Sequence, residues 1–230
     1  MAQSEERREQ AFLFDLDGTL VDSVYQHVLA WREALEDTGI PLSVWRIHRR
    51  IGMSGGLFLN ALLRETGHQL PPEEVTHIQR LHAEAYARLA SQVRVLPGAR
   101  ELLTYLTQLG VPWAIATSGR LETAQPVLDL LEVPKSVPIV TRDQVPYAKP
   151  DPDLFLAAAE RLGVAISASV VVGDSVWDLL AARRARALGV GLLSGGYGEQ
   201  ELERAGAYRV YQDPADLLLH LDEVGVRVAE

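Results

Sequence analysis

Residues 11–23 decide the fold and read Ala-Phe-Leu-Phe-Asp-Leu-Asp-Gly-Thr-Leu-Val-Asp-Ser. The first four residues are apolar, which is typical of a buried strand in a parallel sheet. Two carboxylates, Asp15 and Asp17, follow at the point where that strand is expected to end. In open parallel sheets, ligands bind beyond the carboxyl ends of the strands. Asp15 and Asp17 are therefore candidates for a functional site, although an Asp-x-Asp pair by itself is often only a turn.

The rest of the chain alternates apolar runs with segments of helical periodicity. Further strands are predicted at 113–116, 139–141, 170–172 and 190–193. Helices are predicted at 100–109, at 154–162 with Asp151 as N-cap and Pro152 at its first position, and at 176–188 before Gly189. This alternation predicts an α/β fold with a Rossmann-like, doubly wound parallel sheet and helices on both faces.

Residues 23–92 contain no convincing strand. Apolar residues recur there at helical spacing, and glycines and prolines at 39–41 and 67–72 divide the stretch into helical pieces. The two predicted stripes are Val24, Val28, Trp31 and Leu35, and then Val75, Ile78, His82, Ala85 and Leu89. We therefore predict a discontinuous catalytic core, residues 1–22 and 93–230, with an all-helical cap inserted at 23–92.

Composition limits the partners of this chain. Its 22 basic and 31 acidic side chains argue against nonspecific nucleic-acid binding, and no apolar stretch has the length of a membrane span. The absence of cysteine excludes disulfides, thiolate catalysis and thiolate metal sites. Residues 1–10 are polar, so we expect a disordered tail rather than a signal peptide. We expect a cytoplasmic protein that is monomeric, with a dimer left open.

Polar side chains converge on the same edge of the predicted sheet. Thr117 and Ser118 follow the strand at 113–116, Lys149 precedes the helix at 154–162, and Asp174 and Asp178 follow the strand at 170–172. Each residue alone has an ordinary explanation as a helix cap or a surface group. Their convergence with the carboxylates of residues 11–23 favours a site.

These side chains suit phosphoryl transfer. Asp15 would be the nucleophile, and Asp17 would protonate the leaving oxygen and then activate water. Carboxylates beside a phosphate require a hard cation, and oxygen ligands suit Mg²⁺. Thr117 and exposed backbone N–H groups would hold phosphate oxygens, while Lys149 would offset negative charge.

The chain resembles the haloacid dehalogenase superfamily, in the branch of phosphoglycolate phosphatases and β-phosphoglucomutase-like phosphatases that carries a helical cap. Residues 15–23 look like its first motif, Thr117 its second, Lys149-Pro150 its third and 173–178 its fourth. The resemblance implies Mg²⁺ bound by the side chains of Asp15 and Asp174 and by the carbonyl of Asp17, with Asp178 supporting the site. The phosphate-binding residues that it implies are Asp15, Leu16, Asp17, Thr117, Ser118 and Lys149.

Several alternative reactions can be weighed on single residues. A dehalogenase needs no second acid, so Asp17 speaks against that chemistry. Phosphonate hydrolysis in this branch needs a cap lysine, but the two lysines, Lys135 and Lys149, lie outside the cap. Residues 52–56 fit the Gly-x-Ser-x-Gly elbow of serine hydrolases, which requires a strand before it, whereas 44–51 reads as a helix or loop. No P-loop motif occurs. A non-catalytic binding protein would be expected to lack at least one of the four motifs.

A sugar-phosphate mutase is the main alternative. His27 lies ten residues after Asp17, where such mutases carry a histidine, but Gly55 stands where they carry a phosphate-binding arginine. His27, Arg50 and Ser54 are candidate substrate contacts of the cap, although His27 is equally well explained by packing and Arg50 by a solvated helix face. We predict a Mg²⁺-dependent phosphatase that hydrolyses a small phosphorylated metabolite through an aspartyl-phosphate. Phosphosugars, phosphoglycolate and nucleoside monophosphates all fit.

Overall fold

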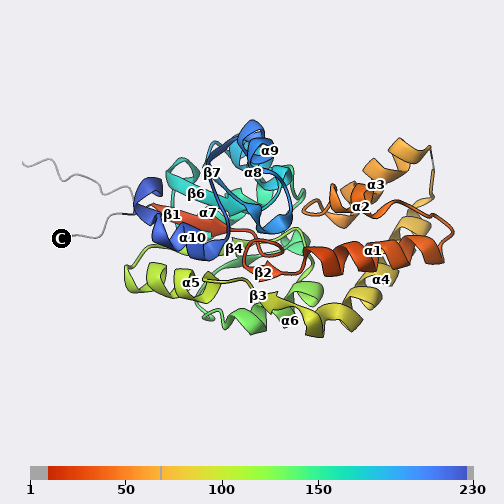
Figure 1. The fold of residues 1–230 in the computed structure, drawn as a ribbon, viewed down its shortest axis with the longest axis horizontal. Coiled ribbons are helices and arrows are strands. Elements are labelled where there is room, and N and C mark those ends of the chain that lie inside the picture. The colour runs from red at the N-terminus through yellow and green to blue at the C-terminus, as the bar shows by residue number, and fades with distance from the viewer. Residues whose placement is uncertain (1–9, 68, 227–230) are drawn as a thin grey trace, which may run out of the picture.

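The computed structural model describes residues 10–67 and 69–226, so the predicted tail lies outside the described residues except for Gln10. A six-stranded sheet forms the core, in the order β5-β4-β1-β6-β7-β8 (Figure 1). All neighbouring strands are parallel, and β1 lies between β4 and β6. The strands are β1 (Ala11–Phe14), β4 (Trp113–Ala116), β5 (Ile139–Val140), β6 (Ser169–Gly173), β7 (Leu188–Leu192) and β8 (Ala207–Tyr211).

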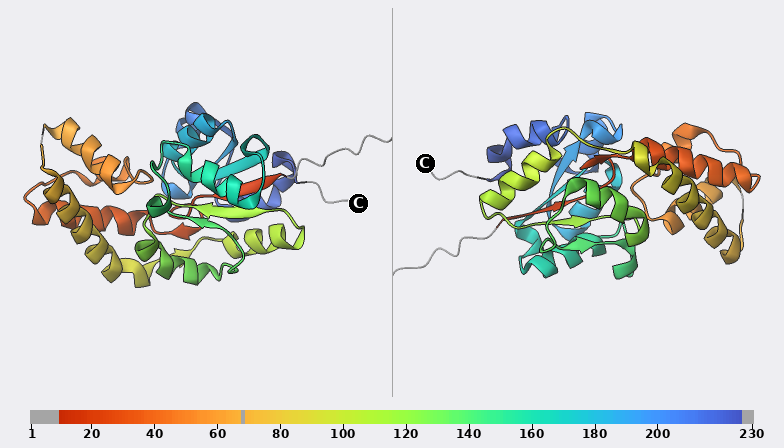
Figure 2. Two further views of the ribbon diagram at one scale, coloured as in Figure 1. Left: turned by 180° about the vertical axis from the view of Figure 1, so that it is seen from behind. Right: turned by 90° about the horizontal axis from the view of Figure 1, so that it is seen from below.

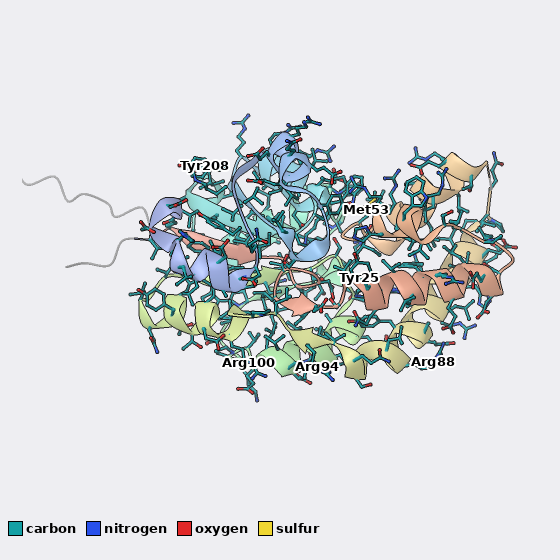
Figure 3. The ribbon with its side chains drawn as sticks, in the orientation of Figure 1. Tyr25, Met53, Arg88, Arg94, Arg100 and Tyr208 are labelled. Atoms are coloured by element: carbon teal, nitrogen blue, oxygen red, sulfur yellow. The ribbon has the colours of Figure 1, made fainter. Side chains whose placement is uncertain are left out.

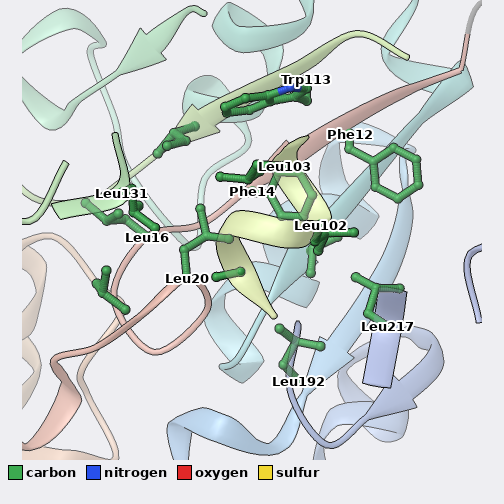
Figure 4. Close-up of a cluster of buried hydrophobic side chains, with 14 of the residues drawn as sticks. Phe12, Phe14, Leu16, Leu20, Leu102, Leu103, Trp113, Leu131, Leu192 and Leu217 are labelled. Carbon is green, nitrogen blue, oxygen red and sulfur yellow. The ribbon is translucent and has the colours of Figure 1, made fainter. Parts of the chain in front are cut away.

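Helices cover both faces of this sheet because alternate residues of each strand point to opposite sides. Phe12 and Phe14 pack with residues of α5 (Ala99–Gln108), α6 (Leu121–Leu131) and α10 (Pro214–Leu219), as Figure 4 shows in part. Leu13, between them, packs on the other face. Its cluster includes residues of α7 (Asp153–Leu162) and α8 (Val176–Ala185). The predicted α/β, doubly wound fold is confirmed.

The four cap helices lie beyond the carboxyl end of β1, outside the sheet (Figures 1 and 2). They are α1 (Val24–Asp37), α2 (Val44–His48), α3 (Gly55–Thr66) and α4 (Pro72–Leu89). The predicted α1 stripe, together with Ile78 of α4, contributes to a separate apolar cluster. Two short antiparallel strands, β2 (Val21–Asp22) and β3 (Arg94–Val95), connect the cap to the core. The boundaries 23 and 92 themselves remain a prediction.

Some predicted boundaries were wrong. The helix predicted at 176–188 ends at Ala185, because Arg186 adopts a left-handed conformation with φ 64°. Gly189 lies inside β7, where a Cβ would approach Leu179 of α8 to 3.1 Å, so this glycine permits close packing and does not end the helix. Asp151 does not cap α7. Pro152 is the N-cap, and Asp151 pairs with Arg184.

Strand ends also differ from the prediction. Thr141 and Leu193, predicted as the last residues of strands, lie just outside β5 and β7, next to or in short 3₁₀ helices. Strand β8, helices α6, α9 (Glu199–Ala205) and α10, and the two connecting strands were not predicted. Among the described residues, no helix is both long and apolar enough to cross a membrane.

Candidate active site

Asp15 lies directly after β1, and its side chain is almost fully buried. Its backbone N–H donates to the carbonyl of Val172 in the adjacent strand, which fixes the start of the loop. One carboxylate oxygen, Oδ1, contacts Nζ of Lys149. The predicted nucleophile is therefore held at the carboxyl end of the central strand with a cation against it.

Lys149 is fully buried, which is rare for a lysine unless it is paired. Besides Asp15, its Nζ atom lies 2.8 Å from Oδ1 of Asp178. Burial disfavours the charged form, but the two carboxylates outweigh it and raise the pKa of Lys149. Lys149 therefore remains a permanent cation between the ends of β1 and β6.

Asp174 and Asp178 follow β6 and are held differently. Oδ1 of Asp174 accepts a 2.9 Å hydrogen bond from Oγ1 of Thr19. Oδ2 of Asp178 accepts hydrogen bonds from the backbone N–H and the hydroxyl of Ser175, which forms a capping box at the start of α8. The other oxygen of Asp178 lies beside Nζ of Lys149, so Asp178 connects the start of α8 to Lys149.

The donor chemistry of this cluster fits a hard divalent cation. Asp15, Asp174 and Asp178 each offer a carboxylate oxygen, and these oxygens lie within 4.8 Å of one another. Burial, together with the nearby carboxylates, raises the pKa of Asp15 to about 7, although Lys149 opposes the rise. The pKa of Asp174 is raised too, for the same reasons. A Mg²⁺ ion would offset this excess of buried negative charge.

Two glycines leave room for the Asp174 carboxylate. A Cβ at Gly195 would lie 1.8 Å from Oδ2 of Asp174, and one at Gly18 would lie 2.4 Å from it. Gly195 has an ordinary backbone conformation, so an added methyl group would act through this clash alone.

We expect Gly195→Ala to displace Asp174 and to lower the predicted Mg²⁺-dependent phosphatase activity by about 100-fold or more at moderate Mg²⁺, because metal sites depend on sub-ångström placement. Part of this loss should be recovered at high Mg²⁺. Initial rates across a Mg²⁺ titration measure it. Gly198→Ala is the matched control, because its Cβ would meet nothing closer than 3.5 Å. Equal Mg²⁺ dependence in both variants would contradict the prediction.

A cavity of about 400 Å³ opens between this cluster and the cap. On the core side it is lined by Asp15, Asp17, Thr117 and Ser118, among others. Oγ1 of Thr117 accepts from the backbone N–H of Gly119 at 3.0 Å, whereas Oγ of Ser118 is buried with no hydrogen-bond partner among the described residues. An unpartnered hydroxyl in a cavity wall is suited to binding an oxygen of a ligand.

Asp17 turns towards the cap. Its Oδ1 accepts a 2.6 Å hydrogen bond from Oγ of Ser23 and lies 3.2 Å from Nε2 of His27. Burial opposes ionisation of Asp17, but the contacts with His27 and Ser23 outweigh it and lower its pKa. The resting carboxyl of Asp17 is thus an ionised group at the junction of core and cap.

The three cap candidates occupy different places. His27 and Ser54 line the cavity, as does Met53, which Figure 3 shows on the side of the cap that faces the core. Ser54 is the N-cap residue of α3, and the element immediately before it is helix α2 rather than a strand, so the serine-hydrolase elbow is not formed. Arg50 pairs with Glu65 and is not among the lining residues.

Three functional neighbours escaped the sequence analysis: Thr19 on Asp174, Ser23 on Asp17, and His82, which contacts His27. Thr19 and Ser23 lie within residues 11–23 and are fully buried, but the spacing of residues in the sequence does not show that a polar side chain is buried. His82 belongs to a predicted apolar stripe, and a polar residue in such a stripe was the one sequence feature that could have marked it as a site residue.

Residues 9–186 match the haloacid dehalogenase-like hydrolases, and the chain belongs to this family. Hexitol phosphatase A of Escherichia coli is 34% identical over 170 residues, which cover 73% of this chain and 76% of that protein. Phosphoglycolate phosphatase of Caulobacter vibrioides is 31% identical over 210 residues, covering 90% and 85%. The predicted enzyme class, a hydrolase acting on phosphoric monoesters, is confirmed by the family and its phosphatase relatives.

Solved structures agree with this assignment. A hydrolase from Pseudomonas syringae is 58% identical and superposes with a TM-score of 0.92, covering 94% of this chain and 99% of that one. A β-phosphoglucomutase from Clostridium difficile has a TM-score of 0.81 at 23% identity, covering 93% and 95%, which shows the shared fold alone. The predicted resemblance to this superfamily is confirmed.

Proposed function

We propose that this protein is a Mg²⁺-dependent phosphatase that hydrolyses a small phosphate monoester through a phosphorylated Asp15. The observation that carries the proposal is the buried contact of Asp15 with Lys149, beside Asp174 and next to a cavity that core and cap residues line together. A carboxylate at the end of the central strand, lining this cavity, is placed to attack a bound phosphorus atom.

In the first half of the reaction, a carboxylate oxygen of Asp15 forms a bond to phosphorus as the bond to the ester oxygen breaks. Asp17 supplies the proton to that departing oxygen, so the alcohol leaves neutral. Thr117, Ser118 and the backbone N–H groups of Leu16 and Asp17 hold the phosphate oxygens. Asp17 must carry a proton for this step, so the negative charge of the bound phosphate has to raise the pKa of Asp17 from its lowered resting value while the contact with His27 remains.

In the second half, Asp17 takes a proton from water as the water oxygen bonds to phosphorus and the bond to Asp15 breaks. The products are inorganic phosphate and an enzyme with Asp15 free and Asp17 protonated again. Asp15 and Asp174, with the carbonyl of Asp17, would hold Mg²⁺, which neutralises charge on the transferring phosphoryl group. Lys149 remains charged throughout and stabilises the carboxylate that attacks and later departs.

The size of the cavity, about 400 Å³, supports a small phosphorylated metabolite as substrate. Hexitol phosphates and phosphoglycolate, named for the relatives, are the first candidates. The mutase alternative rested on His27. It is not favoured, because both ring nitrogens of His27 are at hydrogen-bonding distance from other side chains, those of Asp17 and His82.

The test is phosphate release from a panel of esters, with Mg²⁺ and with chelator. The panel contains hexitol phosphates, sugar phosphates, phosphoglycolate, nucleoside monophosphates and p-nitrophenyl phosphate, with bisphosphorylated hexoses to detect isomerisation. We expect Mg²⁺-dependent release from at least one alkyl phosphate. Isomer without free phosphate would replace the phosphatase by a mutase, and inactivity on the whole panel would refute the proposal.

Metal binding should depend on pH. The folded-state pKa of Asp15 is raised from 3.8 to about 7, so without metal the folded protein retains a proton that the unfolded chain has lost. This contribution to stability is present at low pH and is lost as pH rises through about 7. Mg²⁺ requires the carboxylate, so its binding at pH 5.5 costs about 2 kcal/mol more than at pH 8.

We therefore expect Mg²⁺ to raise the melting temperature more at pH 8 than at pH 5.5, by about 4 °C or more. Thermal unfolding at both pH values, with Mg²⁺ or with NaCl of equal ionic strength, measures the difference. Asp174→Asn should abolish the Mg²⁺ effect at both. A Mg²⁺ effect that is equal at the two pH values would contradict the coupling.

A further inference from the structure

A second histidine of the cap stands behind the contact between His27 and Asp17. His27 belongs to α1 and His82 to α4. Nδ1 of His27 lies 3.2 Å from Nε2 of His82, and Nε2 of His27 lies 3.2 Å from Oδ1 of Asp17. The three side chains form one polar chain, which runs from helix α4 of the cap to the loop that follows β1.

Aromatic rings restrict both imidazoles. The ring of Tyr86 stacks on His27 with 3.9 Å between centroids, and that of Trp31 stacks on His82 with 4.0 Å. Trp31 and Tyr86 are buried, so these stacks belong to the packed interior of the cap. Stacking fixes the plane of a ring, but it does not decide which edge of that ring faces which neighbour.

The contact with His82 supplies the missing constraint. A half-turn of the His27 ring about its Cβ–Cγ bond leaves the plane of the ring unchanged. It would bring ring carbons to the positions of the two nitrogens, and both polar contacts would be lost. Burial, with a further effect of His27, lowers the pKa of His82, so this ring stays neutral at pH 7 with one N–H and one bare nitrogen. His82 thus keeps Nε2 of His27 directed at Asp17.

We propose that His82 is a positioning residue for the acid–base step, which through His27 holds the carboxyl of Asp17 where it protonates the leaving oxygen. The inference rests on the proposed phosphatase function and adds a role for a residue of α4. The proton of the step passes only between Asp17 and the leaving oxygen, or from water to Asp17. Neither histidine gains or loses one.

Two kinds of ester separate positioning from packing. The p-nitrophenolate group leaves as a stabilised anion and needs little protonation, whereas an alkyl alcohol depends on the proton of Asp17. General acid catalysis is commonly worth about 10²–10⁴-fold. Hydrolysis of phosphorylated Asp15 needs Asp17 whichever ester was used, so the two esters are compared by kcat/KM, which reports only the steps up to release of the leaving group. A poorly placed Asp17 should lower kcat/KM for the best alkyl ester of the panel far more than kcat/KM for p-nitrophenyl phosphate.

Two substitutions separate the role of the aromatic ring of His82 from the role of its nitrogens. His82→Phe keeps an aromatic ring against Trp31 but removes both nitrogens, and His82→Gln keeps an amide N–H near the place of Nε2 but removes the ring. We expect His82→Phe to lower kcat/KM for the alkyl ester by about tenfold or more and kcat/KM for p-nitrophenyl phosphate by less than about twofold. His82→Gln should restore most of the alkyl activity. His77→Phe, at an exposed position of the same helix, is the control and should change neither rate.

If His82→Phe lowered kcat/KM by the same factor for both esters, the inference would be overturned, because an equal loss would indicate damaged packing. Failure of His82→Gln to exceed His82→Phe on the alkyl ester would overturn it as well. Should His82→Phe not fold, His82→Asn replaces it, because its shorter side chain removes the contact with His27 without adding bulk. A wild-type protein inactive on both esters would instead refute the phosphatase function, and the inference with it.

Discussion

Asp15→Asn should reduce turnover of the best alkyl phosphate by about 10⁴-fold or more, because a carboxamide cannot form the phosphoryl ester that splits the reaction into two steps. The substitution keeps the size of the side chain, and Lys149 retains its contact with Asp178, 2.8 Å away. The fold should therefore survive. Phosphate release measures the loss, and acid quenching of wild type with ³²P-labelled substrate should trap label on the protein that the variant does not acquire.

Asp22→Asn is the matched control for this substitution. Asp22 belongs to the same stretch, but it is exposed in β2 and pairs in register with Arg94 of β3. We expect it to keep nearly full activity and to be labelled like wild type. If Asp15→Asn retained more than about a tenth of the activity, or became labelled, the nucleophile would have to be another residue.

Lys149→Met should have the second largest effect, on stability and activity together. The substitution preserves an unbranched side chain but removes the cation that Asp15 and Asp178 share in a fully buried position. Breaking a buried ion pair by removing one partner commonly costs about 3–5 kcal/mol. Activity should fall by about 10³-fold, because the attacking carboxylate loses its fixed positive neighbour.

The pH dependence of the stability loss in Lys149→Met shows whether that loss comes from the missing charge. Without Lys149, the carboxylates can avoid repulsion by taking up protons, so the loss of stability should be larger at pH 8 than at pH 5. Denaturant unfolding at the two pH values measures this difference. The only other lysine, Lys135, is exposed, and Lys135→Met should change neither stability nor activity appreciably. A loss that is independent of pH would point to packing rather than charge.

Much of the site could be predicted because its residues follow strands. The run of apolar residues before Asp15 identifies a buried strand, and the carboxyl ends of parallel strands share one edge, so the proximity of Asp15 and Asp174 followed from the order of the elements. Lys149 was added because it precedes the helix predicted at 154–162. The cap could also be predicted, because Val24, Val28, Trp31 and Leu35 repeat at helical spacing. All four are buried in the structure.

Most of the missed elements are short or exposed; the exception is α6, an eleven-residue helix that contains Pro126. Strands β2 and β3 have two residues each, too few for a period to appear. Strand β8 is a partly exposed edge strand, so its residues show no buried run. Helix α8 was predicted too long because Arg186, not a glycine, takes the left-handed conformation that ends it.

By itself, the sequence determined the fold class, the helical insertion and the residues gathered at the sheet edge, because strand order and periodicity are local properties of the chain. Only the tertiary structure decided what each site residue contacts. Lys149 lies between Asp15 and Asp178, and Asp17 reaches His82 through His27, because helices and strands far apart in the sequence pack against one another. Such contacts depend on burial and side-chain direction, which no spacing of residues encodes.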